Sequence, residues 1–301
     1  MMRFIRRVLA AMFVFWQRLG LHITRNHFYG PIPDTRRLPD RLWTGHDVPG
    51  IDFRESEQLA LLRYFSERYG GEFNSFRSDP SDASHEYYLN NPQFGKVDAE
   101  VLYSMIRSLR PQRVIEVGGG HSTTVTARAL LRNREGDGTY APHFISIEPR
   151  PGAILRAGVP GLDELIVAKA EDVAISRFTS LGERDVLFID SSHVLKTGSD
   201  VQYLYLEVLP RLPPGVVIHA HDIYLPGEYP RHLIVDWHRF WTEQYVLQAF
   251  LACNESFEVL FGSHFMHMRH AELLGKMIPS YANEGWPSGL PPSSFWFRRA
   301  R

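Results

Sequence analysis

Carboxylate and imidazole side chains follow two apolar runs in the second half of the sequence. The segment Asp190-Ser-Ser-His193 comes after Val-Leu-Phe-Ile, and His221-Asp222 comes soon after Val-Val-Ile. A carboxylate buried at a strand end needs a partner or a cation. Adjacent parallel strands would bring Asp190, His221 and Asp222 together, and oxygen-rich ligation with open positions suits Mg²⁺ or Mn²⁺. These three residues therefore form a candidate metal site.

His193 is the candidate general base. It lies three residues after Asp190, and an unperturbed imidazole titrates near pH ~6.5. We predict that His193 and Asp190 are catalytic, either directly or with a metal held by Asp190 and Asp222. The alternative for any one of the fourteen histidines is a structural role. His219 is expected to face the opposite side of the sheet and to be structural.

A glycine-rich segment, Glu116-Val-Gly-Gly-Gly120-His-Ser-Thr, follows an earlier apolar run. Glycines let the backbone approach a ligand closely, and the helix that follows offers free N–H groups. A nicotinamide fingerprint would have a third glycine, and the Glu116 carboxylate would repel a pyrophosphate. It suits the ammonium and sulfonium of S-adenosylmethionine. The candidate cofactor-binding residues here are Glu116, Gly118, Gly119, Gly120 and Ser122.

Acidic residues also follow the next two expected strands. Glu148 comes close to thirty residues after the glycines, where a carboxylate accepts hydrogen bonds from ribose hydroxyls. Glu171 and Asp172 follow the third strand, where one of them could accept a bond from an adenine amino group. An N-cap for the next helix is the alternative for these two. Asp190 completes the predicted cofactor-binding set.

These residues need a scaffold that gathers strand ends. The expected strands are Arg113–Val117, Phe144–Ile147, Leu165–Ala168, Val186–Ile189, Val216–His219, Phe257–Phe261 and Phe295–Arg298. The expected helices are Glu55–Tyr69, Val97–Leu109, Ser122–Leu131, Ser199–Leu209 and Trp237–Ala252, with a long irregular insertion over His264–Pro292. Alternating strands and helices indicate an α/β fold with a mostly parallel sheet. Such sheets bind ligands at the carboxyl ends of their strands.

The composition is that of an ordinary globular chain. Its 301 residues are 44% hydrophobic and 22% charged, with 33 Lys and Arg against 34 Asp and Glu. This balance lacks the basic excess of a dedicated nucleic-acid binder, so no nucleic-acid partner is expected. A single cysteine, Cys253, favours a reducing compartment over a disulfide framework. We therefore expect a cytoplasmic location.

The N-terminus combines basic and apolar residues. Arg3, Arg6 and Arg7 precede an apolar run from Val8 to Trp16, which is shorter than the ~20 residues of a membrane span. We expect an amphipathic helix that packs on the body of the protein. The alternatives are peripheral contact of residues 3–18 with the inner face of the membrane and a cleaved signal peptide, which would need a cleavage site that is not evident.

The motifs taken in order resemble class I S-adenosylmethionine-dependent methyltransferases, and more closely the bacterial O-methyltransferases of secondary-metabolite and cell-surface sugar pathways. The resemblance spans Arg113–Arg299. It implies a Rossmann-like, doubly wound, seven-stranded sheet with an antiparallel last strand. It divides the chain into an N-terminal extension, residues 1–95, and a methyltransferase domain, residues 96–301. The stretch Asn26–Asp34 resembles a recurring element of this subgroup, expected as a structural strap or a part of the active-site mouth.

The resemblance implies O-methylation of a small-molecule or glycan acceptor, with Tyr224, Tyr229 and residues 264–292 as candidates for the substrate wall. It extends to metal-dependent catechol and macrolide-sugar O-methyltransferases, although His221 stands where those families have an acidic residue. This departure leaves a metal-free mechanism open. The alternatives are a non-catalytic methyltransferase-like partner protein and a nicotinamide-dependent oxidoreductase.

Overall fold

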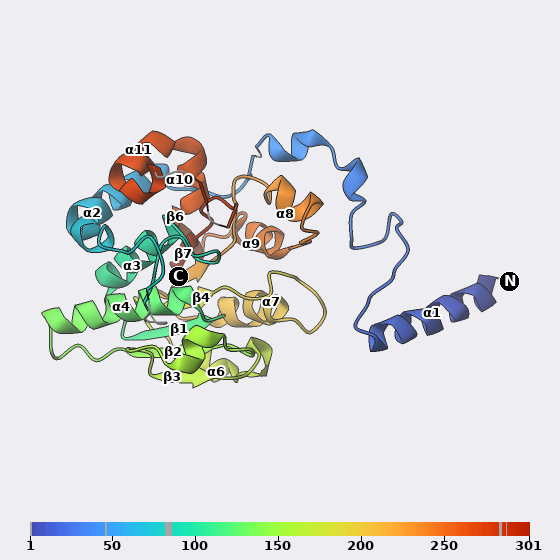
Figure 1. The fold of residues 1–301 in the computed structure, drawn as a ribbon, viewed down its shortest axis with the longest axis horizontal. Helices are drawn as coiled ribbons and strands as arrows, with labels where there is room; N and C mark the ends of the chain where they lie inside the picture. The colour runs from blue at the N-terminus through green and yellow to red at the C-terminus, as the bar shows by residue number, and fades with distance from the viewer. Residues whose placement is uncertain (1, 46, 82–85, 283–284, 287) are drawn as a thin grey trace.

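Seven strands form a single sheet in the order β3-β2-β1-β4-β5-β7-β6 in a computed structural model of the chain (Figure 1). The structure describes all residues except 1, 46, 82–85, 283–284 and 287, and the side chains of residues 2–9 are also outside the description. The strands are β1 (Arg113–Val117), β2 (His143–Ile147), β3 (Glu164–Ile166), β4 (Val186–Ile189), β5 (Val217–Ala220), β6 (Phe257–Gly262) and β7 (Phe295–Arg299). Strands β1 to β5 pair in parallel, and β7 pairs antiparallel to both β5 and β6. The predicted Rossmann-like sheet with an antiparallel last strand is confirmed.

Helices cover both faces of the sheet. The longer ones are α2 (Glu55–Phe73), α3 (Asp98–Leu109), α4 (His121–Gly136), α9 (Glu243–Leu251), α10 (Ser263–Arg269) and α11 (Ala271–Met277). The shorter ones are α5 (Ala153–Ala157), α6 (Ile175–Phe178), α7 (Asp200–Tyr203) and α8 (Arg231–Val235), and α7 continues through a π-helical turn, Leu204–Val208, into a 3-10 turn, Leu209–Arg211. Further short 3-10 helices are η1 (Thr35–Arg37), η2 (Asp40–Trp43), η3 (Ala170–Asp172) and η6 (Pro279–Ala282).

Several expected boundaries are wrong for identifiable reasons. Helix α2 continues past Gly70 to Phe73, because the buried side chains of Tyr69 and Phe73 pack on the next helix. The expected helix from Trp237 begins only at Glu243. The stretch expected as an irregular insertion contains α10 and α11, whose buried Phe265 and Leu274 join the core.

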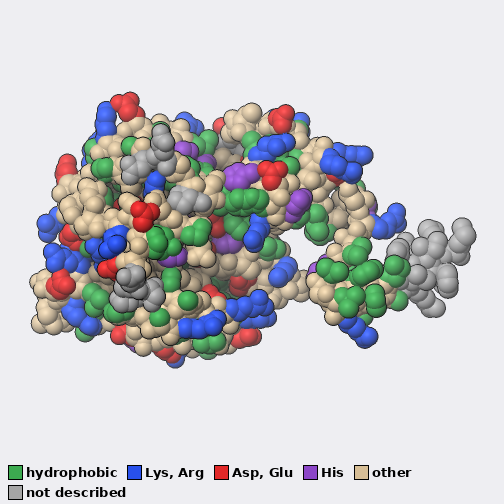
Figure 2. Space-filling model, in the orientation of Figure 1, with side chains coloured by type: hydrophobic (Ala, Val, Ile, Leu, Met, Phe, Trp, Pro, Cys, Tyr) green, Lys and Arg blue, Asp and Glu red, His purple; other side chains and the backbone are tan. Residues whose placement is uncertain are grey.

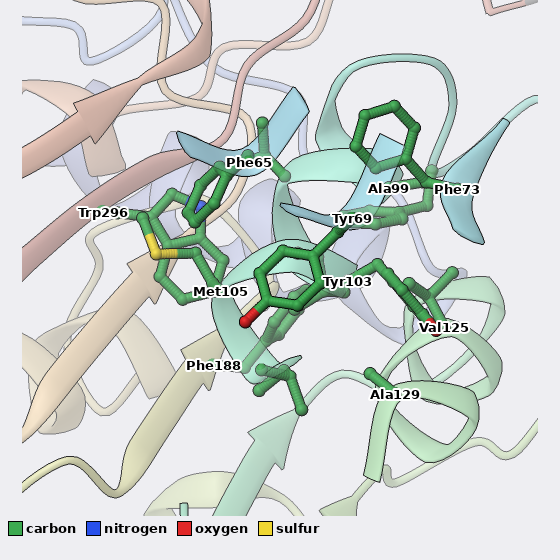
Figure 3. Close-up of a cluster of buried hydrophobic side chains, with 14 of the residues drawn as sticks. Phe65, Tyr69, Phe73, Ala99, Tyr103, Met105, Val125, Ala129, Phe188 and Trp296 are labelled. Atoms are coloured by element: carbon green, nitrogen blue, oxygen red, sulfur yellow. The ribbon is translucent and has the colours of Figure 1, made fainter. Parts of the chain in front are cut away.

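Side chains of the strands alternate between two cores, as the period of an extended strand requires. Val114, Phe144 and Phe188 face a core formed with α2, α3 and α4. Figure 3 shows Phe188 and Trp296 among the aromatic and aliphatic side chains of these helices. Ile115, Leu187 and their equivalents face a second core on the opposite side, formed with α7 and α9. Burial on both faces fixes the register of the strands and therefore the relative positions of their ends.

Helix α1 (Met2–Arg18) projects away from this body (Figures 1 and 2). None of the residues from 10 to 18 is buried. The amphipathic helix is confirmed, whereas the expectation that it packs on the body is wrong in this structure. Arg3, Arg6 and Arg7 belong to the side chains outside the description. No helix in the described part of the chain is long and apolar enough to cross a membrane.

Candidate functional site

The sheet register brings the predicted site residues to one edge. Gly118 donates its backbone N–H to Ile147 O, and Asp190 donates its own to Val117 O, at 2.9 and 2.8 Å. His221 N–H donates in turn to Ile189 O at 2.9 Å. The first residues beyond β2, β1, β4 and β5, which are Glu148, Gly118, Asp190 and His221, therefore lie in a row. This juxtaposition is the one that the strand order predicts.

Position 118 requires glycine because the loops that follow β1 and β4 approach each other closely there. Its φ of +85° lies in the left-handed region, and a Cβ built on it would stand 1.7 Å from Asp190 O. A Cβ on Gly119 would meet Ser146 Oγ at 2.4 Å, whereas one on Gly120 would meet nothing within 4 Å. The first two glycines therefore serve the packing of β1 against its neighbours. Gly120 leaves open space beside the first turn of α4.

Glu116 is buried behind the glycine loop. Its two carboxylate oxygens accept hydrogen bonds from Ser122 Oγ at 2.7 Å and Thr123 Oγ1 at 2.5 Å. Burial raises the pKa of Glu116 to about 7; the nearby Asp190 charge adds to that rise, and the hydroxyl bonds oppose it. Through these hydrogen bonds Glu116 and Ser122 fix the start of α4. Their contact with a cofactor stays a prediction.

A cleft of about 560 Å³ opens at the ends of β1, β2 and β4. Its lining includes four of the predicted cofactor-binding residues, Gly118, Glu148, Glu171 and Asp190. Glu148 Oε1 accepts a hydrogen bond from the backbone N–H of Arg150 at 2.7 Å, which orients the carboxylate and leaves its second oxygen for a ligand. Asp172 is exposed outside the lining. Of the two acidic residues at this strand end, the geometry favours Glu171.

The chemistry of this cleft suits a molecule that carries charges of both signs. Besides its carboxylates, the lining contains the cationic side chains of Arg150, Lys169 and Lys196. S-adenosylmethionine carries a carboxylate, an ammonium and a sulfonium, so a mixed lining fits it better than a purely acidic one. The volume lies within the range of ordinary ligand pockets.

His193 lies at the centre of a buried cluster of carboxylates. Its Nε2 is 3.3 Å from Asp190 Oδ1 and 3.4 Å from Asp222 Oδ2, and its Nδ1 is 2.8 Å from Glu243 Oε2. His193 and Asp222 both adopt left-handed backbone conformations, with φ of 59° and 58°. Such conformations are costly for residues other than glycine and concentrate at functional sites. Here they accompany the convergence of the His193 and Asp222 side chains.

A second imidazole adjoins this cluster. His221 Nε2 lies 3.3 Å from Asp98 Oδ2, while its Nδ1 lies 3.7 Å from Asp190 and 3.9 Å from Asp222. Asp98 is held by the backbone N–H groups of Ser293 and Ser294, both at 2.9 Å. It therefore ties the start of α3 to the β5 end and to the segment that enters β7.

The contacts of His219 agree with the expected structural role. The expectation that it faces the opposite side of the sheet from His221 is wrong. It is buried, its Nε2 lies 2.7 Å from Ser294 Oγ, and its ring stacks on Trp296 with 4.2 Å between centroids. Residues two apart in a strand share a face, and the rings of His219 and His221 both contact Phe94. Burial and the adjacent His221 hold the pKa of His219 well below its usual value.

Electrostatics distinguish the two histidines of the cluster from His219. Burial acts to lower the pKa of His193 and of His221, but the surrounding carboxylates prevail and raise both well above the usual range. Those imidazoles in turn hold the pKa of Asp190 well below its usual value, against the effect of burial. The cluster therefore concentrates negative charge around positions that favour a cation.

One group of side chains in the described part of the chain could hold a metal ion. It consists of Asp190, His193 and Asp222, whose ligating atoms all lie within 4.8 Å of one another. Two carboxylates and one imidazole form a donor set that suits Mn²⁺ or Mg²⁺. The predicted set contained His221 in place of His193. The donor atoms fit a divalent cation, and the ligand role of each residue stays a prediction.

Sequence reasoning missed Asp98 and Glu243. Each lies at the first residue of a helix, where acidic residues are common because they complement the helix dipole. That ordinary explanation conceals their contacts with His221 and His193. The feature that distinguishes these two carboxylates from ordinary helix-start acids is their almost complete burial, which only the structure reveals.

A second pocket of about 300 Å³ lies on the other side of Asp190. Asp98, Asp190, His221 and Asp222 form its polar end. Its remaining lining includes Trp237, Arg239, Trp241, Trp286 and Lys96. Tyr224 and Tyr229, the predicted wall residues, are instead fully buried, and the Tyr224 hydroxyl donates to Asp222 at 3.1 Å.

The segment between α8 and α9 has two different sides. Trp237, Arg239 and Trp241 line the second pocket, whereas His238 and Phe240 line a groove with the N-terminal residues 22–26, 30 and 32–36. Most of the predicted strap, Asn26–Asp34, therefore lies behind the wall of the pocket.

The chain is similar to several known proteins. Residues 115–223 match a family described as a methyltransferase domain. An uncharacterized protein of Archaeoglobus fulgidus is 32% identical over 179 residues, which are 56% of this chain and 77% of the archaeal one. Among solved structures, an O-methyltransferase from Bacillus cereus in complex with SAH is similar at 15% identity and a TM-score of 0.39, covering 80% of this chain and 91% of that one.

The chain belongs to the class I S-adenosylmethionine-dependent methyltransferases. The matched segment begins inside β1 and ends just after Asp222. It therefore contains both the glycine loop and the strand ends that carry the acidic cluster.

Proposed function

We propose that this protein is an O-methyltransferase that methylates a hydroxyl group of a small-molecule or glycan acceptor. The observation that carries the proposal is the position of Asp190. This residue lines both the cleft at the glycine loop and the pocket of tryptophans. A cofactor in the first cavity and an acceptor in the second would meet at its carboxylate. Holding two reactants in contact is a large part of the catalysis of such a transfer.

The chain's own residues would handle the proton of the acceptor hydroxyl. S-adenosylmethionine, when bound in the cleft, supplies an electrophilic methyl group. Asp190 and Asp222 line the acceptor pocket beside the place where the attacking oxygen would lie, and His193 Nε2 lies 3.3 and 3.4 Å from their carboxylate oxygens. Glu243, at 2.8 Å from Nδ1, fixes the ring of His193 so that Nε2 faces this place. The surrounding carboxylates favour the protonated form of His193, so its ring would accept the hydroxyl proton only after losing its own. In the alternative form, the carboxylates would hold a cation beside the ionised hydroxyl.

A divalent cation bound by Asp190, His193 and Asp222 would supply positive charge that favours the ionised hydroxyl. The same three residues would then serve chiefly to position it. Arg239 and Lys96 add positive charge to the acceptor pocket, and the tryptophan rings offer flat apolar surfaces. These features support an acceptor with a ring, such as a sugar or a phenol.

A labelled methyl group provides the test. The protein is incubated with S-adenosylmethionine labelled in its methyl group, with Mn²⁺ or Mg²⁺, and with a panel of phenols and sugars, and NMR locates the label. We expect the label on oxygen, and we expect Asp222→Asn to lose most of the transfer. Asp40→Asn, an exposed change in the N-terminal region, is the matched control. Label on nitrogen or carbon would contradict O-methylation, and absence of cofactor binding would favour a non-catalytic partner protein.

A chelator separates the two forms of the mechanism. If the cation is required, EDTA abolishes transfer, and added Mn²⁺ restores it in the wild type but not in Asp222→Asn. Activity that survives the chelator would assign proton removal to His193 alone.

A further inference from the structure

We propose that helix α1 and the segment that follows it bind the surface of an anionic phospholipid bilayer. This inference goes beyond methyl transfer and concerns a part of the chain that lies outside the site. The proposed surface comprises the described apolar residues Met12, Phe15, Leu19, Leu21 and Ile23.

Exposure of large apolar side chains is the first observation. Phe15 is 56% exposed, and Leu19 and Ile23 are 58% and 55% exposed. Two more aromatic side chains, Phe28 and Tyr29, are 94% and 88% exposed shortly afterwards. Figure 2 shows apolar side chains gathered on the projecting part of the molecule. Exposed apolar groups that lie together mark contact surfaces for proteins or membranes.

The charge of this region is the second observation. Five arginines and no acidic residue occur in residues 1–33. The chain has 33 Lys and Arg in all, so 28 of them remain to face all 34 Asp and Glu in the rest of the sequence. The N-terminal segment is therefore strongly cationic on a body that is net acidic. This asymmetry favours an anionic partner for the segment and disfavours the protein's own surface as that partner.

The periodicity of the helix combines the two features. The sequence of α1 is strongly amphipathic, with arginines at positions that share one side and Met12, Phe15 and Trp16 on the other. A helix with a basic polar face and bulky apolar residues lies in the plane of the bilayer interface. The cationic residues then face the headgroups, and the apolar residues enter the acyl region. A bilayer surface satisfies both faces at once, whereas an apolar groove would satisfy only one.

The geometry of attachment leaves the site accessible. Helix α1 lies apart from the body, and residues 22–36 connect it to the loop behind the acceptor pocket (Figure 1). Binding through α1 therefore holds the catalytic body next to the bilayer without covering the sheet edge that carries Asp190.

The test is co-sedimentation of the full chain with vesicles. One set contains phosphatidylcholine alone, and the other contains phosphatidylcholine and phosphatidylglycerol in equal amounts. We expect partitioning on the order of a hundredfold stronger to the anionic vesicles, because each surface arginine adds favourable energy, and a decrease as salt screens the charges. We expect Phe15→Glu to weaken this partitioning about tenfold or more.

Leu206→Glu is the matched control. Leu206 is 53% exposed on the catalytic body, so the change replaces an equally exposed apolar residue with the same charge. It should partition like the wild type, and all three proteins should bind S-adenosylmethionine equally. Equal partitioning to the two vesicle types, or equal effects of the two substitutions, would overturn the proposal. So would a wild-type dimer in light scattering that Phe15→Glu converts to a monomer without vesicle binding, since a second copy would then cover the surface.

Discussion

Replacement of Glu148 by alanine tests the assignment of the cofactor cleft directly. Glu148 is the first residue beyond β2 and lines the cleft, and one of its oxygens accepts a hydrogen bond from Arg150 N–H at 2.7 Å. If the carboxylate accepts a hydrogen bond from a ribose hydroxyl, its removal sacrifices a charged hydrogen bond of about 1.5–3 kcal/mol. That energy corresponds to a loss of affinity for S-adenosylmethionine of roughly 10- to 150-fold.

Calorimetric titration with S-adenosylmethionine and with S-adenosylhomocysteine measures this loss. Both ligands share the ribose, so Glu148→Ala should weaken them by the same factor. Glu148→Gln retains an acceptor oxygen and should lose less. Asp172→Ala is the control, because Asp172 is the neighbouring acidic candidate that lies outside the lining. The reasoning is refuted if folded Glu148→Ala binds both ligands as tightly as the wild type, or if Asp172→Ala is the weaker binder.

The remaining predictions concern the glycine loop, the buried acid behind it and the partner of the histidine. Gly118→Ala places a methyl group 1.7 Å from a backbone oxygen at a φ of +85°, so it should lower the unfolding free energy by about 1–3 kcal/mol. Gly120→Ala is the control and should leave the unfolding free energy unchanged. Equal urea midpoints for the two variants would contradict this prediction. Burial raises the pKa of Glu116 to about 7, above its unfolded value near ~4.3, so ionisation of Glu116 lowers the stability of the folded state as pH rises from about 4 to 7. In urea titrations, the stability of the wild type relative to Glu116→Gln should therefore fall over that pH range. A stability difference that does not change with pH would contradict this prediction. Glu243→Gln keeps a hydrogen-bonding atom near His193 but removes the charge, so kcat should fall at least about tenfold with little change in the acceptor KM. An equal effect on KM would indicate a general loosening of the pocket.

The candidate site divides into a part that sequence reasoning reached and a part that it missed. Glu148, Asp190 and Asp222 each follow an apolar strand, and their gathering follows from the order of parallel strands alone. Asp98 and Glu243 come from helix starts that are distant in sequence, and nothing in their local pattern separates them from ordinary dipole-compensating acids. His193, and not the predicted His221, groups with Asp190 and Asp222 as a metal-ligating set. His193 has a left-handed backbone conformation, which the periodicity of the sequence does not encode.

The sequence by itself determined the class of fold and the row of residues at the sheet edge. Strand runs such as Arg113–Val117 and Val186–Ile189 are largely continuous apolar runs, because each strand is buried on both faces. Only the tertiary structure decided which side chains share a cavity. Glu116 turns inward to the start of α4, Asp190 lies between two cavities, and Trp241 faces the pocket while Phe240 faces the strap. These orientations depend on contacts between segments far apart in the chain, where loop conformation and packing outweigh any local pattern.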